Sequence, residues 1–443
     1  MMRSPRSEAL AGAVIARLRG AGHQAFLVGG CVRDLLLGLA PGDFDVATDA
    51  RPDRIMDLFP RTSRVGARFG EVLVRDFFSQ VEVNTFRSDA DYSDGRGPDA
   101  VHFERDPRGD ALRRDFTING LMMDPDTGAV LDYVDGRADL ERRVIRAVGD
   151  VDARFDEDPV RLLRAVRFAA RLRFEIEPAT LAGIQRHHGL IHKMAAERIR
   201  DLLARILTEG GARRGFVLLE ETGLLADILP EVAAMKGVPQ PPEDHPEGDV
   251  WTHTLLLLEQ LEHPTLTLAL GALLHDVGKP PTLRMDGRIR FDGHAEVGVE
   301  MAHAILHRLR FSRDVMEQVE ALVGNHLRFL EAGHMKDSTL KRFLRLPEFP
   351  EHLELHRLDC LSGNRHLENY ELLRRKLGAF PEERLKPEPL LTGADLIAAG
   401  YKPGPQFSRI LTAVEDAQLR GSIRTAGEAM EMVREKFTVD SLQ

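Results

Sequence analysis

A Pro-rich polar segment near the middle of the chain, residues 238–249, limits how the 443 residues can be organised. It contains four prolines together with glycine and acidic residues. Proline lacks the backbone donor that helices and strands need, so such a cluster interrupts regular structure. We therefore expect a linker here, with separately folded parts on either side. At roughly 100–200 residues per domain, the length allows two to four domains.

The two sides of this segment differ in their hydrophobic patterns. Short β-rich runs at residues 25–28, 44–47, 72–75 and 81–86 alternate with helical patterns, which predicts an α/β fold. Apolar spacing becomes helical from about residue 155, and a histidine-rich helical block follows the break. The predicted domains are an α/β head with a small mixed sheet (1–147), an all-α neck and body (148–237), the linker (238–249), an all-α domain (250–375) and a helical tail (376–443).

Composition and charge narrow the class of protein. Hydrophobic residues make up 43% of the chain, and the two cysteines, Cys31 and Cys360, show no paired pattern. This fits a cytoplasmic protein and argues against a disulfide scaffold. No apolar run approaches the roughly 20 residues that span a bilayer, so we expect no membrane partner. The net charge is −10, yet residues 141–214 hold 16 Lys and Arg against 11 Asp and Glu. That segment is either a phosphate-binding surface or an ordinary solvated helical face.

A glycine pair, Gly29 and Gly30, lies between a predicted strand and the start of a helix. Glycine lets backbone N–H groups approach a phosphate closely, and a helix N-terminus adds partial positive charge. A plain turn is the alternative.

Asp43 and Asp45 follow within the next predicted strand. Alternate residues of a strand share a face, so both carboxylates converge while Phe44 points into the core. Paired carboxylates hold Mg²⁺ for phosphoryl transfer. Glu82, in another β run, is a candidate third carboxylate, although an exposed strand residue explains it equally well.

Two stretches together carry a family resemblance: GGCVRDLLLG at residues 29–38 followed by Asp43 and Asp45, and RRDFTING at residues 113–120. The combination resembles the class II tRNA nucleotidyltransferases and bacterial poly(A) polymerases, within the DNA polymerase β-like superfamily. The resemblance implies catalysis with Mg²⁺ at Asp43 and Asp45, and Glu82 stays a candidate third carboxylate. It also implies that the incoming nucleotide is bound by Arg114, Asp115 and Asn119, and Gly29, Gly30 and Arg33 of the glycine turn are further nucleotide-binding candidates.

The sequence EDPVR at residues 157–161 resembles the E-D-x-x-R motif on the neck helix of that family. Asp158 and Arg161 are three apart, and Asp158 is expected near the helix N-cap. A carboxylate accepts from the amino group of cytosine or adenine, and a guanidinium donates to the neighbouring ring nitrogen. Uracil and guanine present the wrong pattern, so these two side chains can select C and A without a template. Arg164 and Arg167 continue the spacing, as triphosphate contacts or as part of a solvated face. A helix ion pair is the alternative for Asp158 and Arg161.

Residues 87–98 are polar and glycine-rich, and resemble the family's flexible loop, which helps to switch specificity from C to A. Its candidate residues are Arg87, Tyr92, Asp94 and Arg96. Enzymes that add only CC have a shortened loop, so its presence argues against that subgroup. Bacterial poly(A) polymerases have a different local pattern, with consecutive basic residues where this chain has Gly66-Ala67-Arg68, and they have a basic C-terminus where this chain does not. Both differences favour tRNA over general polyadenylation.

The histidine-rich block resembles the HD superfamily of metal-dependent phosphohydrolases. Its candidate ligands are His253, His275, Asp276, His294, His326 and Asp359. Imidazole and carboxylate ligands suit Mg²⁺, Mn²⁺, Ni²⁺ or Fe²⁺ better than a cysteine-rich zinc site. An isolated helical histidine is usually a satisfied or surface residue, which is the alternative for each.

The sequence therefore predicts a cytoplasmic enzyme that adds C, C and A to the 3′ end of tRNA from CTP and ATP, with a second phosphohydrolase activity. Two alternatives stay open. One is an A-adding or poly(A)-adding enzyme with the same active site, and the other is an RNA-binding protein in which only the HD domain is active. The sequence leaves the oligomeric state undetermined.

Overall fold

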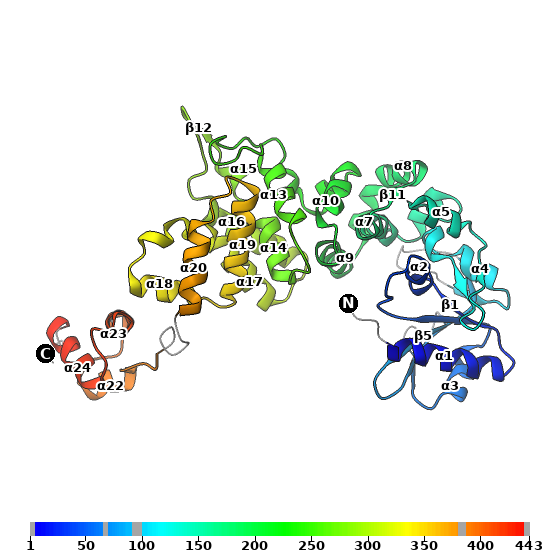
Figure 1. The fold of residues 1–443 in the computed structure, drawn as a ribbon, viewed down its shortest axis with the longest axis horizontal. Helices are drawn as coiled ribbons and strands as arrows, with labels where there is room; N and C mark the ends of the chain where they lie inside the picture. The colour runs from blue at the N-terminus through cyan, green and yellow to red at the C-terminus, as the bar shows by residue number, and fades with distance from the viewer. Residues whose placement is uncertain (1–4, 65–69, 91–99, 380–386, 438–443) are drawn as a thin grey trace. The chain divides into compact units, whose positions relative to one another are not determined.

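The computed structural model describes residues 5–64, 70–90, 100–379 and 387–437 (Figure 1). Its contacts divide the chain into two compact units. The first comprises residues 1–233 with two short returns, Leu261–His263 and Arg308–Phe311. The second comprises the remaining residues. The segment 238–249 belongs to the second unit and is not a separate body.

The first unit begins with a seven-stranded sheet in the order β3-β4-β5-β2-β1-β8-β9. β2 and β5 are parallel, and the other neighbours are antiparallel, so the sheet is mixed as the sequence predicts. The strands are β1 (Ala25–Val28), β2 (Asp45–Thr48), β3 (Thr62–Arg64), β4 (Glu71–Arg75), β5 (Gln80–Thr85), β8 (Met122–Met123) and β9 (Val130–Leu131). The four runs of β-type sequence all become strands, with ends within one residue of the prediction.

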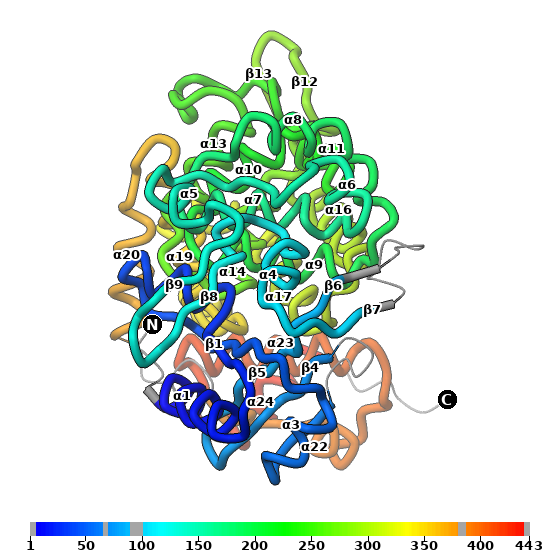
Figure 2. Tube along the Cα trace, turned by 90° about the vertical axis from the view of Figure 1, so that its right-hand side faces the viewer, coloured from blue at the N-terminus to red at the C-terminus, as the bar shows by residue number. Residues whose placement is uncertain are grey.

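Helices cover this sheet because its alternating side chains supply an apolar face. α1 (Pro5–Gly20) packs on β1, β2 and β5 (Figure 2). A cluster of Val28, Ala47, Phe86, Ala111 and Met122 forms part of the core. The remaining elements of the head are α2 (Gly30–Leu36), α3 (Pro52–Leu58), α4 (Pro107–Leu112), the 3-10 turn η1 (Thr117–Asn119) and a separate hairpin of β6 (Arg87–Ala90) with β7 (Ala100–Phe103).

The rest of the first unit is helical apart from a two-stranded parallel sheet of β10 (Val144–Ile145) and β11 (Glu175–Ile176). α7 and α10 approach closely at Gly211, where an added Cβ would lie 2.4 Å from the carbonyl oxygen of Ala170. The φ of Gly211 is +78°, which glycine adopts without strain. The helices are α5 (Gly136–Arg142), α6 (Val151–Glu157), α7 (Val160–Leu172), α8 (Pro178–His187), α9 (Ala196–Thr208), α10 (Ala212–Glu221), α11 (Leu224–Ile228) and α12 (Pro230–Ala233), with the 3-10 turn η2 (His188–Lys193).

The second unit is helical except for a hairpin of β12 (Arg284–Met285) and β13 (Ile289–Arg290), where the sequence predicts helix alone. Its main helices are α13 (Val250–Glu259), α14 (Leu266–Leu274), α15 (Lys279–Thr282), α16 (His294–Arg308), α17 (Arg313–Asn325), α18 (Asp337–Leu344), α19 (Phe349–Ser362) and α20 (Glu368–Ala379), with the 3-10 turn η3 (His326–His334). The C-terminal helices α22 (Gly393–Ala398), α23 (Pro405–Arg420) and α24 (Ala426–Lys436) share an apolar core of their own. None of the described helices is both long and apolar enough to cross a bilayer.

Candidate functional site

A polar pocket of about 460 Å³ lies within the first unit, between the sheet and the neck helices. Acidic side chains line its sheet side, and arginines from the helical side face them. The pocket is lined by Asp45, Glu71, Glu82, Asn84, Arg87, Arg113, Arg114, Asp115, Asp158, Val160, Arg161, Arg164 and Arg198. Seven of the residues that the sequence predicts for nucleotide transfer therefore share one cavity.

The carboxylates are brought together by strand register. Asp45 on β2 is the parallel partner of Glu82 on β5, and Val28, at the end of β1, pairs with Asp45 on the other side. Phe44 is buried and Asp43 is exposed immediately before the strand, in the predicted alternation. Burial, the charge of Asp43 and then that of Glu82 raise the pKa of Asp45 to about 7. A raised pKa of this kind marks a cluster of negative charge that a divalent cation would relieve.

The glycine turn makes room for an arginine. Gly29 has φ +75°, and an added Cβ would lie 2.8 Å from Nη1 of Arg114. Arg114 in turn donates through Nη2 to Asp110 Oδ2 at 3.0 Å. Asp110 is fully buried, and its carboxylate also accepts from Arg113. The turn therefore brings the backbone against a guanidinium whose orientation a buried carboxylate holds.

Arg33, predicted to bind nucleotide, is buried beneath this turn and outside the pocket lining. Its Nη1 donates to Asn119 Oδ1 at 2.7 Å, and its Nε donates to Asp34 Oδ1 at 2.8 Å. Asn119 then donates to Asp115 Oδ1 at 3.1 Å. Arg33 and Asn119 thus support the pocket from behind, and Asp115 carries the chain of contacts to its surface.

Asp115 is the best-held charge of the pocket. Its Oδ2 accepts from Arg164 Nε at 2.7 Å. Burial alone would raise the pKa of Asp115, but Arg164 and Asn119 outweigh it and lower the pKa to about 2. The carboxylate is therefore ionised at neutral pH, and it fixes Arg164 at the pocket wall.

Asp158 and Arg161 line the same pocket, but each has a different partner. Asp158 is the C-cap of α6 and lies directly before Pro159, the N-cap of the neck helix α7, as the sequence predicts. Its Oδ1 accepts from Val160 N at 3.1 Å and its Oδ2 accepts from Arg198 at 3.3 Å. Arg161 donates to Glu157 Oε2 at 2.6 Å and to the backbone oxygen of Arg154. The two predicted base-reading side chains are thus held separately, which leaves polar atoms of each for a ligand.

Arg167, predicted to bind nucleotide, lies outside the pocket. It is buried, 3.6 Å from Glu209 and 4.5 Å from the ring centre of Phe168. Burial lowers its pKa to about 10. Arg87, expected in a flexible loop, lines the pocket from strand β6, where it is buried and lies 3.4 Å from Glu71. Tyr92, Asp94 and Arg96 lie outside the described residues.

The structure adds pocket residues that the sequence reasoning missed, notably Glu71 and Arg198, and it adds Glu157, which lies outside the lining and holds Arg161. Burial is the main cause that raises the pKa of Glu71, followed by the charge of Glu82. Glu157 was visible as the first letter of the E-D-x-x-R motif, and Arg198 lies within the basic segment. Glu71 had no sequence signal, because strand pairing places it beside Asn84 and β5.

The second unit contains a cluster of four histidines, and the Nδ1 atom of each one has a hydrogen-bond partner outside the cluster. Backbone oxygens hold three of them: Ala272 for His275 at 3.0 Å, Phe291 for His294 at 2.8 Å, and Val323 for His326 at 2.6 Å. His253 Nδ1 lies 2.6 Å from Glu247 Oε1. The four Nε2 atoms are therefore left for other partners, the arrangement that metal-ligating histidines adopt.

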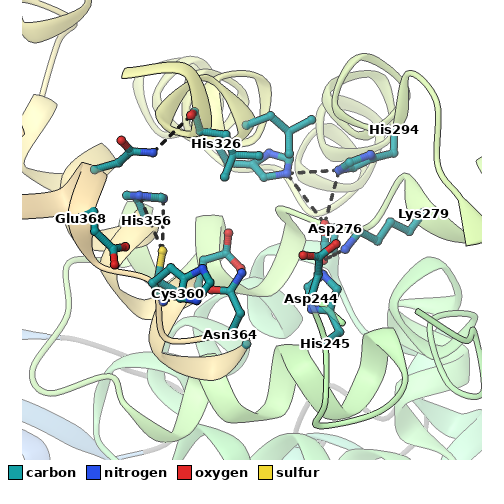
Figure 3. A pocket seen from close by; sticks show the side chains of 16 residues that line it. Asp244, His245, Asp276, Lys279, His294, His326, His356, Cys360, Asn364 and Glu368 are labelled. Carbon is teal, nitrogen blue, oxygen red and sulfur yellow. Dashed lines mark hydrogen bonds and ion pairs between the residues drawn. The ribbon is translucent and has the colours of Figure 1, made fainter. Parts of the chain in front are cut away.

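Two groups of possible metal ligands result, and all six predicted ligands fall in them. One contains His253, His275 and Asp359, and the other Asp276, His294 and His326. Asp276 lies 3.6 Å from His294 Nε2 (Figure 3). It also lies 3.2 Å from His275 Nε2, so it stands between the groups. His275 Nε2 is buried without a hydrogen-bond partner among the described residues, and beside it Asp276 Oδ2 also lies 2.7 Å from Lys279 Nζ. A ring nitrogen without a partner next to a carboxylate fits a divalent cation, which would satisfy the nitrogen.

The electrostatics of this cluster agree with cation binding. Burial lowers the pKa of His326 to about 4, which keeps its imidazole neutral and able to ligate. Burial also disfavours the cation of His253, but Asp359 and Glu247 outweigh it and raise the pKa to about 9. The negative charge that would attract a proton to His253 equally attracts a metal ion.

A pocket of about 370 Å³ opens onto this cluster (Figure 3). Asp276, His294, His326 and Asp359 form part of its wall, and Lys279 lies with them. His245 and Asp244, from the segment predicted to be a linker, also line it, together with Leu327, Leu330, His356, Cys360, Gly363, Asn364, His366, Glu368 and Asn369. The cavity is large enough for a small phosphate ester beside the metal ligands.

Comparison with known families divides the chain in a similar way. Residues 25–146 match the poly A polymerase head domain, and residues 173–236 match the probable RNA and SrmB-binding site of polymerase A. Residues 248–361 match the HD domain. The head match contains the carboxylate strands, and the HD match contains all six predicted metal ligands.

Individual relatives have a common name. The chain is 46% identical over 220 residues to the CCA-adding enzyme of Levilactobacillus brevis, and 42% identical over 232 residues to that of Geobacillus stearothermophilus. These matches cover 50% and 52% of this chain, and they span only 55% and 56% of the relatives' length. The crystal structure of the Bacillus stearothermophilus CCA-adding enzyme in complex with CTP is 27% identical, with a TM-score of 0.74. That likeness covers 98% of this chain and 99% of the other.

Proposed function

Since the chain belongs to the family of nucleotidyltransferases that carry the poly A polymerase head domain, we propose that it adds C, C and A to the 3′ end of tRNA. The substrates are CTP and ATP, no template is used, and the reaction takes place in the cytoplasm. One observation carries the proposal: Asp45 and Glu82 are register partners at the floor of a pocket whose opposite wall is arginine.

Asp43, Asp45 and Glu82 are the side chains that would hold Mg²⁺. The ion supplies neutralisation of the triphosphate and activation of the 3′ hydroxyl of the RNA. Arg114 and Arg164 are oriented by Asp110 and Asp115, so they are positioned to receive triphosphate oxygens. Fixed carboxylate partners reduce the entropy that these arginines lose when nucleotide binds.

Base selection is assigned to Asp158 and Arg161. The Asp158 carboxylate accepts from the amino group of cytosine or adenine, and Arg161 donates to the adjacent ring nitrogen. UTP and GTP would leave these polar groups unpaired, at a cost of about 1–3 kcal/mol per group. Glu157 supports the selection by holding Arg161 at 2.6 Å.

A second activity is proposed for the HD unit, as a phosphohydrolase that uses a divalent metal, Mg²⁺, Mn²⁺, Ni²⁺ or Fe²⁺. The observation that favours it is the convergence of the histidine Nε2 atoms on Asp276 and Asp359. RNA-end phosphates such as 2′,3′-cyclic phosphates are the proposed substrates.

The decisive experiment supplies the pure protein with tRNA transcripts that end before, within and after CC, with each nucleoside triphosphate given singly and Mg²⁺ present. Ordered incorporation of C, C and then A supports the proposal. Addition of A alone, or of a long A tail, supports the A-adding or poly(A) alternative. No incorporation, with metal-dependent hydrolysis retained, supports the alternative in which only the HD domain is active.

A further inference from the structure

The segment 238–249 makes buried polar contacts with the HD cluster. Glu247, of whose side chain 8% is exposed, lies 2.6 Å from Nδ1 of His253, which is fully buried. Gln240 is also buried, and its Oε1 accepts from Lys279 Nζ at 2.7 Å. Lys279 Nζ in turn lies 2.7 Å from Asp276 Oδ2. The segment therefore reaches two members of the cluster through side chains that the matched ligand motif does not include.

We propose that Glu247 is a positioning residue that prepares His253 to ligate the metal of the HD unit. The inference rests on the proposed metal site. Its carboxylate accepts the Nδ1–H of His253 and so leaves Nε2 as the ring nitrogen that faces Asp359 Oδ1, 3.0 Å away, where Nε2 donates in the absence of metal and would ligate a cation that displaces its proton. The other three histidines obtain the same orientation from backbone oxygens, which cannot vary with sequence. His253 alone depends on a side chain, so it is the ligand whose orientation a substitution can remove.

A carboxylate does more here than a backbone oxygen does. A negatively charged acceptor increases the electron density on the imidazole and strengthens its bond to a cation. The same oxygen of Glu247 also lies 2.9 Å from His245 Nδ1, so a second imidazole restrains the carboxylate. Asp249 fixes the end of the segment, because its side chain accepts from Thr252 N at the start of α13. Glu247 is thus held between a fixed helix start and its target.

The alternative role for Glu247 is that of a direct metal ligand. His245, Glu247 and His253 also form a group with metal-ligand spacing, and Glu247 Oε2 is buried without a partner among the described residues. Glu247 would then ligate a further ion directly. Against this, His253 Nε2 already faces Asp359, so ligation through both ring nitrogens would require a doubly deprotonated imidazole. The two interpretations differ in the number of ions bound.

The test uses the full chain with Glu247→Ala and Glu247→Gln. Glu243→Gln, at an exposed position of the same segment, is the matched control. Metal-stripped protein is titrated with Mn²⁺ by calorimetry, and bound metal is counted by elemental analysis at saturation. We expect Glu247→Ala to bind Mn²⁺ about 10- to 100-fold more weakly with the same number of ions at saturation. Glu247→Gln keeps an acceptor without its charge and should lie between Glu247→Ala and the parent, while Glu243→Gln matches the parent.

Nitrogen NMR of the histidines supplies a readout that a purely structural role would not change. In the Mg²⁺-loaded protein the parent should show the His253 proton on Nδ1 alone, and Glu247→Ala should show a mixture of protonation states. The metal-free melting temperature should be unchanged. If Glu247→Ala does not fold, Glu247→Gln carries the same comparison. An affinity within twofold of the parent overturns the proposal, as does the loss of one bound ion at saturation. A parent that binds no metal instead defeats the proposed metal site itself.

Discussion

Asp45 on β2 and Glu82 on β5 are direct partners in the one parallel pair of the described head sheet. The two residues are 37 positions apart in sequence, and their side chains line the same pocket. Parallel register places the side chains of partner residues on the same face, so two carboxylates meet there. Two hydrophobic partners would be more stable at this position, because like charges directly opposite each other are destabilising. Burial first, and then the charges of Asp43 and Glu82, raise the pKa of Asp45.

Asp45→Asn should abolish nucleotide addition and leave tRNA binding nearly unchanged. Loss of a metal-ligating charge removes several kcal/mol of transition-state stabilisation, roughly a thousandfold in rate. Phosphate contacts from basic helices supply binding instead. Single-turnover CTP incorporation and filter binding of tRNA measure the two effects, with the exposed Asp57→Asn on α3 as control. Incorporation at the parental rate would remove Asp45 from the catalytic assignment.

The same Asp45→Asn variant should be more stable than the parent when both are metal-free at pH 8. Burial and neighbouring carboxylates raise the folded-state pKa of Asp45 to about 7. As pH rises toward 7 the unfolded chain loses this proton before the folded chain does, so the folded state is disfavoured, and the full penalty is present above pH 7. We expect a gain on the order of 1–3 kcal/mol at pH 8. The gain should shrink as pH falls below 7 and vanish below about pH 4, where the carboxyl is protonated in both states. Urea unfolding with chelator present, at pH 4, 6 and 8, tests this; a gain that does not vary with pH would contradict it.

Asp158→Ala together with Arg161→Ala should relax the choice among the four triphosphates more than it lowers affinity for tRNA. Side chains that contact base edges decide which base is accepted, whereas contacts to the RNA backbone position the RNA. Glu157→Gln should produce a weaker form of the same defect, because it loosens the 2.6 Å contact that holds Arg161. Competition assays with all four triphosphates provide the measurement. A double variant that still rejects UTP and GTP as strongly as the parent would exclude base reading by this pair.

His275→Ala with Asp276→Ala should remove metal-dependent phosphohydrolase activity and leave CCA addition within a few-fold of the parent. The two candidate sites share no residue. Both assays should accompany a melting curve, because a bound metal also stabilises the helices that ligate it. Loss of nucleotide addition at an unchanged melting temperature would mean that the two sites act in one cycle.

Much of the fold was predictable because local patterns carry it. Short β-rich apolar runs at 25–28 and 72–75, and the helical spacing beyond 155, identify elements that the sequence alone predicts. The exception at Arg87 has a physical reason. A polar run with glycine predicts a loop. Arg87 pairs with β7 and contacts Glu71 only once the strands have come together, and neither contact is visible in the local sequence.

The order of the residues specifies which chemical groups this protein has and how they are spaced locally: the paired aspartates before and in β2, the E-D-x-x-R motif, and the histidines of the second unit. The partners of these groups depend on how distant elements pack. Arg161 is held by Glu157 and Asp158 by Arg198, because the turn from α6 to α7 separates two side chains that a continuous helix would have placed together. The sequence predicts a linker at residues 238–249 because prolines exclude regular structure. The same lack of regular backbone hydrogen bonds lets Gln240 contact Lys279 and lets Glu247 contact His253. Local sequence specifies backbone conformation, whereas contacts between distant side chains depend on how the elements pack.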